Sequence, residues 1–214
     1  MQPVTPLAFS RVSAMFSKIS LRRLAVAFAA AFVIAGATVT VAMNHVSGPN
    51  AAQPLPQIGG HFALSMPDGR RVTDATFRGK WLLVYFGYTS CPDVCPTTLS
   101  AMALALDKLG PLADKVQPVF ITVDPERDTG KIVGEYVKDF DPRFVGLVGS
   151  PQEIGTAAHE FHVYYRVRQL GNNEYVVDHS SFIYLLDPNG TFVRLLTGDL
   201  PGHQLADELR KLMS

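Results

Sequence analysis

The sequence predicts a mixed α/β domain in which a central sheet is flanked by helices on both faces. Residues 81–88 and 116–123 are continuous apolar runs, which are typical of strands buried on both faces of a sheet. Between them, residues 97–109 place apolar side chains at helical spacing, so one face of a helix would be buried. A strand, a helix and a second strand in this order favour a sheet with helices packed against it.

The rest of the domain continues this alternation, and turn residues separate its elements. In chain order we expect a small hairpin at residues 62–66 and 72, a helix at 132–140, a short strand at 144–148, a helix at 151–161, a hairpin at 164–168 and 175–177, a second hairpin at 182–186 and 191–196, and an amphipathic helix at 205–213. The turns are Pro67-Asp68-Gly69, Gly171-Asn172-Asn173 and Asp187-Pro188-Asn189-Gly190. A strand–helix–strand unit followed by a terminal hairpin and helix is the pattern of a thioredoxin-like fold, here one domain at residues 58–214.

The N-terminal part of the chain has the composition of a membrane anchor. Residues 24–43 contain no charged residue, Asn, Gln, His or Pro, and as a helix they would span roughly 30 Å, the thickness of a bilayer core. Four basic residues precede this run: Arg11, Lys18, Arg22 and Arg23. Basic residues beside a first membrane helix tend to stay cytoplasmic. We therefore expect a short cytoplasmic segment at 1–23, a single transmembrane helix at 24–43 in the cell inner membrane, and the domain in the periplasm.

A cleaved signal peptide is the alternative for the same segment. The apolar stretch at residues 24–34 has signal-peptide length, and Ala35-Gly36-Ala37 resembles a cleavage site of small residues. The apolar run continues as far as Met43, however, which a cleaved signal does not need. This continuation favours the anchor, and both interpretations place the domain outside the cytoplasm.

A linker and a mildly acidic domain follow the anchor. Residues 44–57 are rich in proline, alanine and polar residues and contain no Lys, Arg, Asp or Glu, which is typical of a flexible linker. The chain has 19 basic and 19 acidic residues, and four of the basic ones precede the anchor, which leaves 15 against 19 for the exported part. Because no basic tract is present, nucleic acid is not expected as a partner.

The chemistry of the chain centres on its two cysteines. Cys91 and Cys95 lie in the turn between the strand at 81–88 and the following helix. Pro96 suits the first helical position, where a missing N–H costs nothing. Both sulfurs would therefore lie near a helix N-terminus, whose partial positive charge favours thiolate over thiol. Thiolate is the reactive form both as a nucleophile and as a metal ligand.

A purely stabilising disulfide is the simplest interpretation of this pair, since disulfides are common outside the cytoplasm. A ring of about five residues contributes only about 2 kcal/mol in the chain-entropy model, however, which is the low end of the usual range. A cysteine pair this close in sequence, at a strand-to-helix turn, is better placed to be a reactive site than to be a stabilising cross-link.

Thiol–disulfide exchange and metal binding are the two functional interpretations. Exchange enzymes of this fold typically have two residues between their cysteines, whereas Cys91 and Cys95 are separated by three. The extra residue lets both sulfurs turn toward one external point, as a chelate requires. Two thiolates form a soft site, which selects Cu(I), zinc or an iron–sulfur cluster over magnesium or calcium. Because two ligands are few, we expect a third elsewhere in the chain.

His179 is the best candidate for this third ligand. It lies between the hairpin expected at 164–177 and the strand at 182–186, and in a thioredoxin-like fold the loop that enters this strand packs against the cysteine turn. Ser181 occupies the place where the fold usually has a cis-proline. His179 can therefore face the two sulfurs where an exchange enzyme would hold its substrate.

The other five histidines fit a metal site less well. His45 lies in the linker, His61 at the start of the domain, and His203 at the start of the last helix. His159 and His162 are three residues apart on a predicted helix, which falls short of the spacing of a metalloprotease motif. None of them is expected to bind metal.

Three motifs resemble those of the Sco/SenC family of copper metallochaperones. They are, in order, Tyr85-Phe86-Gly87-Tyr88-Thr89-Ser90-Cys91-Pro92-Asp93-Val94-Cys95-Pro96, Thr122-Val123-Asp124-Pro125-Glu126-Arg127-Asp128-Thr129 and Val177-Asp178-His179-Ser180. The resemblance covers nearly all of residues 58–214, and a membrane anchor fits it. For residues 124–129 we can derive no chemistry, and we expect this stretch to cap and orient the following helix.

The resemblance implies that Cys91, Cys95 and His179 bind copper, as both Cu(I) and Cu(II). Two thiolates and an imidazole suit three-coordinate Cu(I), with room for a fourth ligand to Cu(II). The chain would be a carrier without catalytic residues, delivering copper to the dinuclear centre in subunit II of cytochrome c oxidase during assembly. Other periplasmic copper carriers and thiol reductants would be further partners.

Two alternatives use the same cysteines. In one, the chain is a membrane-anchored thiol–disulfide reductase that keeps oxidase cysteines reduced, and Cys91 and Cys95 form a redox-active disulfide. In the other, the pair is a redox or peroxide sensor. His179 separates these readings, because copper binding needs it and simple exchange does not.

Overall fold

The computed structural model describes residues 58–172 and 174–213. The expected N-terminal segment at 1–23, the anchor at 24–43 and the linker at 44–57 lie outside the described residues. Within the described part, no helix is both long and apolar enough to cross a membrane. By its internal contacts the chain divides into two units, Met1–Pro54 and Leu55–Ser214, and the second contains the whole described domain.

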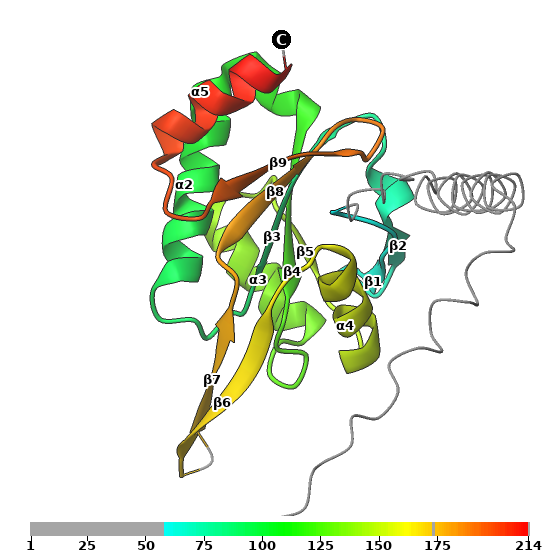
Figure 1. Ribbon diagram of the computed structural model, residues 1–214, viewed down its shortest axis with the longest axis vertical. Coiled ribbons are helices and arrows are strands. Elements are labelled where there is room, and N and C mark those ends of the chain that lie inside the picture. The colour runs from blue at the N-terminus through cyan, green and yellow to red at the C-terminus, as the bar shows by residue number, and fades with distance from the viewer. Residues whose placement is uncertain (1–57, 173, 214) are drawn as a thin grey trace, which may run out of the picture. The chain divides into compact units, whose positions relative to one another are not determined.

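A five-stranded mixed sheet forms the centre of the domain (Figure 1). In spatial order its strands are β5 (Val145–Leu147), β4 (Val116–Thr122), β3 (Trp81–Gly87), β8 (Phe182–Leu186) and β9 (Phe192–Thr197). Strands β3, β4 and β5 run parallel, whereas β8 is antiparallel to β3 and β9 to β8. The predicted mixed sheet is confirmed, and the order β4-β3-β8-β9 is that of a thioredoxin-like fold.

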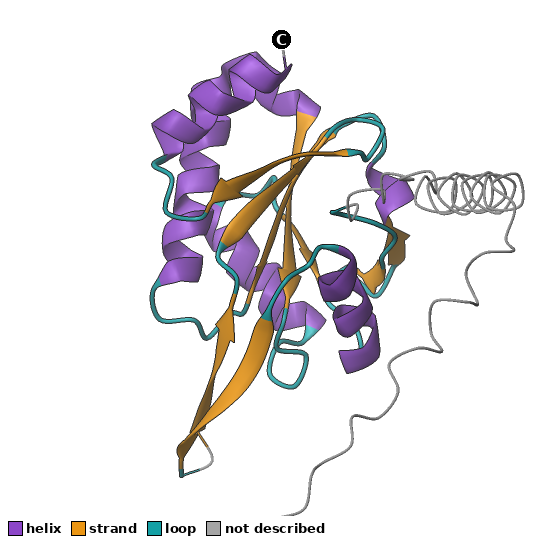
Figure 2. Ribbon diagram, in the orientation of Figure 1, coloured by secondary structure: helices purple, strands orange, loops and turns teal. Residues whose placement is uncertain are grey.

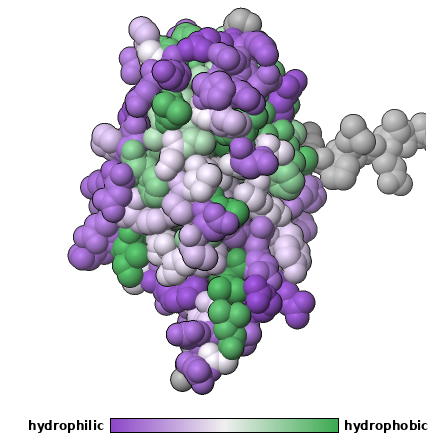
Figure 3. Space-filling model, turned by 90° about the vertical axis from the view of Figure 1, so that its left-hand side faces the viewer, coloured by the Kyte–Doolittle hydropathy of each residue, from purple (hydrophilic) through white to green (hydrophobic). Residues whose placement is uncertain are grey.

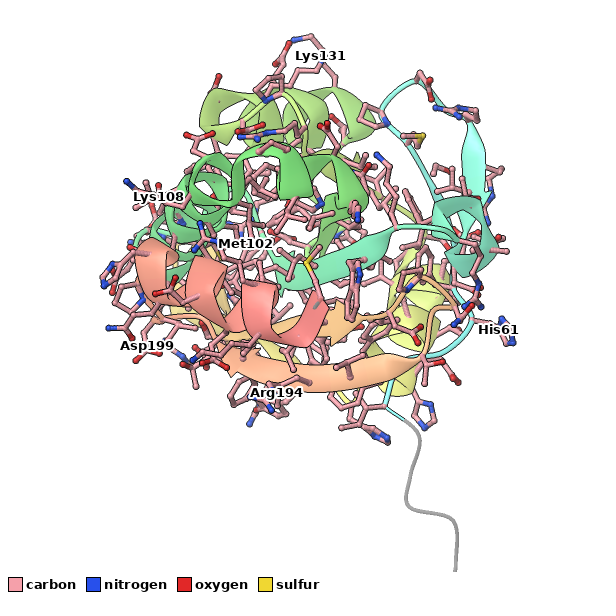
Figure 4. The ribbon with its side chains drawn as sticks, turned by 90° about the horizontal axis from the view of Figure 1, so that it is seen from above. His61, Met102, Lys108, Lys131, Arg194 and Asp199 are labelled. Carbon is pink, nitrogen blue, oxygen red and sulfur yellow. The ribbon has the colours of Figure 1, made fainter. Side chains whose placement is uncertain are left out.

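Helices cover both faces of this sheet, as predicted (Figure 2). They are α2 (Val94–Leu109), α3 (Gly130–Phe140), α4 (Pro151–Glu160) and α5 (Gly202–Met213). On the face of α2, α3 and α5, Phe120 of β4 packs against Tyr136 of α3, and Met102 of α2 lies between the helices and the sheet (Figure 4). On the other face, Phe86 of β3 packs against Phe161, directly after α4. The core is therefore continuous on both sides of β3.

Local sequence signals set the starts of two helices. Thr129 precedes α3, and its side chain accepts a hydrogen bond from the backbone N–H of Ile132. At α4, Ser150 and Glu153 form a reciprocal capping box, and Pro151 takes the first helical position. The expectation that residues 124–129 cap the following helix is therefore met by Thr129.

Two hairpins lie outside the central sheet. Strands β1 (Ala63–Ser65) and β2 (Arg71–Thr73) pair about the predicted turn. Strands β6 (Tyr165–Gly171) and β7 (Glu174–His179) form a long antiparallel ribbon that projects from the domain (Figure 1). Two short 3-10 helices, at Asp74–Phe77 and Gly110–Lys115, were not predicted.

Two predicted boundaries were wrong where the chemistry lies. Helix α2 begins at Val94 rather than at 97, so Pro96 is its third residue and not its first. This is possible because N–H groups in the first turn have no intrahelical partner, and a proline there loses no bond. Strand β7 continues through His179, which pairs with Tyr165, so His179 ends a strand instead of lying in a loop.

Candidate metal centre

Cys91, Cys95 and His179 converge at one point, although 84 positions separate Cys95 from His179. Their potential ligand atoms all lie within 4.8 Å of one another, and Cys95 Sγ is 3.3 Å from His179 Nε2. Both cysteines are free thiols. Among the described residues, this is the one group of three or more His, Cys, Asp and Glu side chains placed to share an ion.

The two cysteines come from one turn but have different surroundings. Cys91 is half-buried in the loop that follows β3, whereas Cys95 is fully buried in the first turn of α2. The backbone N–H of Cys95 points to Cys91 Sγ at 3.5 Å. Tyr85, from β3, donates its hydroxyl proton to Cys95 Sγ at 3.9 Å. One sulfur is therefore open to a partner and the other is held inside the domain.

These surroundings separate the acidities of the two thiols. A hydrogen bond from Cys95 holds the pKa of Cys91 far below its usual range, and hydrogen bonds from His179 and from the backbone N–H groups of Asp93 and Cys95 act in the same direction. The same contact with Cys91, together with burial, raises the pKa of Cys95. Cys91 is consequently the thiolate of the pair, and Cys95 keeps its proton until a cation or an electrophile arrives.

Gly87, the last residue of β3, makes room for the buried sulfur. A Cβ atom at this position would lie 2.8 Å from Cys95 Sγ and 3.0 Å from the Phe120 ring. Only glycine lets the sulfur approach the strand this closely. A glycine at the end of an otherwise bulky apolar run is the sequence signal for such a close approach, and Gly87 was not among the predicted site residues.

His179 is oriented by its own neighbours. Its Nδ1 atom lies 3.0 Å from the carbonyl oxygen of Ser180, to which Nδ1–H donates, and its Nε2 atom faces Cys95 Sγ at 3.3 Å. The ring also makes edge contacts with Tyr85 and Tyr88, with centroids 6.2 Å and 5.8 Å apart. The imidazole is thus oriented with Nε2 toward the sulfurs, where this atom can bind a metal ion.

Asp128 holds the cysteine turn and was not among the predicted site residues. Its carboxylate is buried and accepts hydrogen bonds from the backbone N–H and hydroxyl of Thr89, at 3.0 Å and 2.6 Å, and from the hydroxyl of Thr122, at 2.6 Å. The turn before Cys91 is thereby tied to the end of β4. The available signal was an acidic residue close behind a buried strand, but its partner Thr89 lies 39 positions away.

Other histidines lie apart from this centre. His61 is 94% exposed and pairs with Asp74 at the periphery of the domain (Figure 4), and the side chain of His159 is 84% exposed. The rings of His159 and His162 are 6.4 Å apart between centroids, with neither cysteine beside them. His45 is outside the described residues.

The family model described as SCO1/SenC matches residues 50–214, which is most of the chain. The chain belongs to the SCO1/SenC family. Its resemblance to this family, stated from three motifs, is therefore confirmed.

Named relatives and solved structures agree with this membership. The protein SCO1 homolog 1, mitochondrial, of Arabidopsis thaliana is 47% identical over 148 residues, which are 69% of this chain and 44% of the relative. A copper-bound crystal structure of Arabidopsis thaliana ScoI is 44% identical with a TM-score of 0.70, covering 73% of this chain and 98% of that one. Copper-bound Bradyrhizobium japonicum ScoI is 41% identical with a TM-score of 0.67, covering 72% and 98%. The chain spans about half the length of the curated relatives it matches.

Proposed function

We propose that this chain is a copper metallochaperone that binds one copper ion through Cys91, Cys95 and His179. The observation that carries the proposal is the convergence of two sulfurs and an imidazole nitrogen within 4.8 Å. Two soft thiolates favour Cu(I), and the added imidazole allows the site to bind Cu(II) as well. Copper-bound relatives of the same fold, at 44% and 41% identity, support the choice of metal.

Delivery follows from the unequal exposure of the two cysteines. Cys91 is half-buried at the surface, so an incoming ligand from a partner can replace it, while Cys95 and His179 still hold the ion. We propose that the recipient is the dinuclear copper centre in subunit II of cytochrome c oxidase, as the family resemblance implies. Other periplasmic copper carriers would load the site, and thiol reductants would keep the cysteines competent for binding.

We further propose that the chain is held in the cell inner membrane by residues 24–43, with its domain in the periplasm. The charge-free apolar run and the basic residues before it support this topology. A reporter that works only in the cytoplasm should be inactive when it is fused after Ser214. Activity of such a fusion would contradict the orientation.

A thiol–disulfide reductase is the second candidate, supported by the free thiols and the lowered pKa of Cys91. In that reaction the Cys91 thiolate attacks one sulfur of a partner's disulfide and releases the other as a thiol. Cys95 then attacks the mixed disulfide, which frees the partner's second thiol and leaves Cys91 and Cys95 joined. A thiol reductant must then restore the pair.

His179→Ala separates the two candidates. The variant keeps both thiols, so we expect it to reduce a disulfide substrate at near wild-type rate. It loses one of three ligands, so its Cu(II) affinity should fall by about 100-fold or more. Competition against a chelator of known affinity measures this loss on the purified, reduced full-length chain.

His159→Ala is the matched control, because that ring is 84% exposed and lies away from the cysteines. It should bind copper as wild type does. If His179→Ala also retains wild-type copper affinity and supports oxidase assembly at limiting copper, the carrier proposal is wrong and the reductase takes its place.

A further inference from the structure

The loop between β4 and α3 contains an ion pair with no role in the site as described so far. Arg127 Nε donates to Asp124 Oδ2 at 2.5 Å, and the Asp124 side chain is 1% exposed. The second carboxylate oxygen of Asp124 accepts a hydrogen bond from the Tyr175 hydroxyl at 2.8 Å. Burial and this hydrogen bond raise the pKa of Tyr175 to about 12, so the phenol remains a donor at neutral pH. Both oxygens of the buried Asp124 carboxylate thus accept hydrogen bonds.

Arg127 joins this pair to both arms of the site. Its Nη1 atom donates to the carbonyl oxygen of Tyr175 at 3.1 Å, and its guanidinium lies over the Tyr175 ring, 3.8 Å from the centroid. On another side the guanidinium lies 5.6 Å from the centroid of the Tyr88 ring. Tyr175 belongs to β7, and Tyr88 belongs to the cysteine turn. One side chain therefore contacts the segment that leads to His179 and the segment that leads to Cys91.

Tyr88 connects Arg127 to the candidate metal ligand His179. The Tyr88 ring makes an edge contact with the His179 ring, with centroids 5.8 Å apart. Along β7, Tyr175 and His179 lie on the same face because side chains alternate along a strand. Val177, between them on that face, is 3% exposed and packs into the core. The position of His179 relative to the sulfurs depends on how this face of β7 is held.

No ladder of backbone hydrogen bonds holds this face of β7 to the central sheet. Strands β6 and β7 form a separate two-stranded sheet that has no ladder to the five-stranded sheet. The residues of β6 after Tyr165 are exposed, and the hairpin projects from the domain (Figure 1). An isolated two-stranded hairpin is only marginally stable in water. Its placement against the cysteine turn therefore depends on the contacts that side chains make with β7, in addition to the short link from His179 to β8.

We propose that Asp124, Arg127 and Tyr175 form a latch that positions His179 against Cys91 and Cys95, with Arg127 as its central positioning residue. The proposal rests on the copper-binding function proposed above and deepens it. The latch keeps the imidazole at bonding distance when no metal is present, so that Cu(II), which depends most on the imidazole, binds to a preformed site. Loss of the latch leaves all three ligands in the chain but allows the β7 arm to move.

Arg127→Lys is the direct test, because it keeps the charge but loses the planar fork and the stacking on Tyr175. We expect Cu(II) affinity to fall by about 10-fold, as for other residues that orient metal ligands, and the sulfur-to-copper charge-transfer band to shift. Cu(I) affinity, which depends on the two thiolates, should change by less than about threefold. Tyr175→Phe removes only the hydroxyl that reaches Asp124, and it should give a smaller change in the same direction.

Arg194→Lys serves as the matched control, since Arg194 of β9 also pairs with a carboxylate, Glu208, but contacts neither arm of the site. It should leave both copper affinities and the spectrum unchanged. Thermal unfolding of each variant shows whether the fold is intact, and Tyr175→Phe keeps the test decisive if Arg127→Lys fails to fold.

Hydrogen exchange of the copper-free chain separates failure of the latch from failure of the proposed function. In wild type the amide of Ser180 donates to the Tyr164 carbonyl at 2.8 Å and should be protected. Arg127→Lys should raise exchange at Ser180 and along β7, while the amides of β3 and β4 keep wild-type rates. Wild-type exchange and wild-type Cu(II) binding in Arg127→Lys would overturn the latch, and so would equal losses of Cu(I) and Cu(II) with global unfolding. If the wild-type chain binds no copper, but Arg127→Lys still raises hydrogen exchange along β7, only the proposed copper function is overturned.

Discussion

The two arms of the candidate metal centre are supported in different ways. The cysteine arm rises from β3, the middle strand of the central sheet, and enters α2, whose inward residues Leu99, Met102 and Leu106 are fully buried. The histidine arm is β7, which pairs only with the exposed strand β6. Figure 3 shows apolar side chains on the surface of the projecting end, where Val167 and Leu170 are 47% and 54% exposed.

The sulfur and imidazole ligands therefore differ in their freedom to move relative to the domain. The Cys95 sulfur is part of the domain core, and Cys91 lies in the short turn between β3 and α2, two elements of that core. The imidazole is attached through side-chain contacts, so a partner that displaces β7 could remove one ligand without unfolding the domain. The proposed carrier function requires both firm binding and release of copper, and the exposed Cys91 and the β7 arm are the two places where a partner can act.

Loss of Asp128 should have the largest effect, because it loosens the cysteine arm. Asp128→Ala removes three hydrogen bonds to Thr89 and Thr122 and leaves the Thr122 hydroxyl buried without its acceptor. We expect the free energy of unfolding to fall by about 3 kcal/mol, measured by urea denaturation, because bonds to a buried charge are strong. The cysteine turn should then exchange its amides as fast as the β6–β7 hairpin.

Asp107→Ala is the control for Asp128, because Asp107 is an exposed carboxylate that pairs with Arg143 on the surface. It should change stability by less than about 1 kcal/mol. Retention of wild-type stability and slow exchange at the cysteine turn in Asp128→Ala would show that this arm does not depend on the carboxylate.

A methyl group at Gly87 tests how firmly the cysteine arm holds the Cys95 sulfur. Because a Cβ atom there would lie 2.8 Å from Cys95 Sγ, Gly87→Ala must displace a sulfur that the core otherwise holds in place. We expect affinity for both Cu(I) and Cu(II) to fall by about 10-fold, in contrast to the Cu(II)-selective loss expected from the latch. Chelator competition with each ion makes the measurement.

The matched substitution is Gly155→Ala in α4, where the nearest atom to the new Cβ is 3.7 Å away. This variant should bind copper normally and gain up to about 1 kcal/mol in stability, since alanine favours a helix over glycine. Normal copper binding by Gly87→Ala would mean that the sulfur of Cys95 is not rigidly held.

The smallest expected effect concerns the acid-sensitive contact between Asp141 and Arg143, away from the metal centre. Hydrogen bonds from Arg143 lower the pKa of Asp141, which follows α3. Because the folded-state pKa lies below the unfolded one, the contact stabilises the fold above the unfolded pKa and is lost as pH falls through the folded pKa. Asp141→Asn should therefore be less stable than wild type at pH 7 by about 1 kcal/mol, and the difference should shrink in acid.

Copper affinity at pH 7 should be the same in Asp141→Asn and in wild type, because Asp141 contacts neither arm of the site. Urea denaturation at pH 7 and at pH 3 provides the comparison. A difference in stability that grows in acid would contradict the direction assigned to this pKa.

Most elements of the fold and the three candidate ligands could be predicted from the sequence. Apolar runs, helical spacing and turn residues such as Asp187-Pro188-Asn189-Gly190 are local signals, and each corresponds to an observed strand, helix or turn. Cys91, Cys95 and His179 could be named because their side chains have few structural uses and because the thioredoxin-like topology predicts which loops meet. The family motifs identified the same residues.

Only the tertiary structure decided how these residues are held. Asp128 meets Thr89 across 39 positions, Tyr175 meets Asp124 across 51, and the choice of Nε2 on His179 depends on the direction of the Ser180 carbonyl. The boundaries of α2 and β7 were likewise set by packing. Periodicity and turn chemistry act over a few residues, whereas a buried carboxylate takes whichever distant donors the packed elements bring to it, and no local pattern encodes that choice.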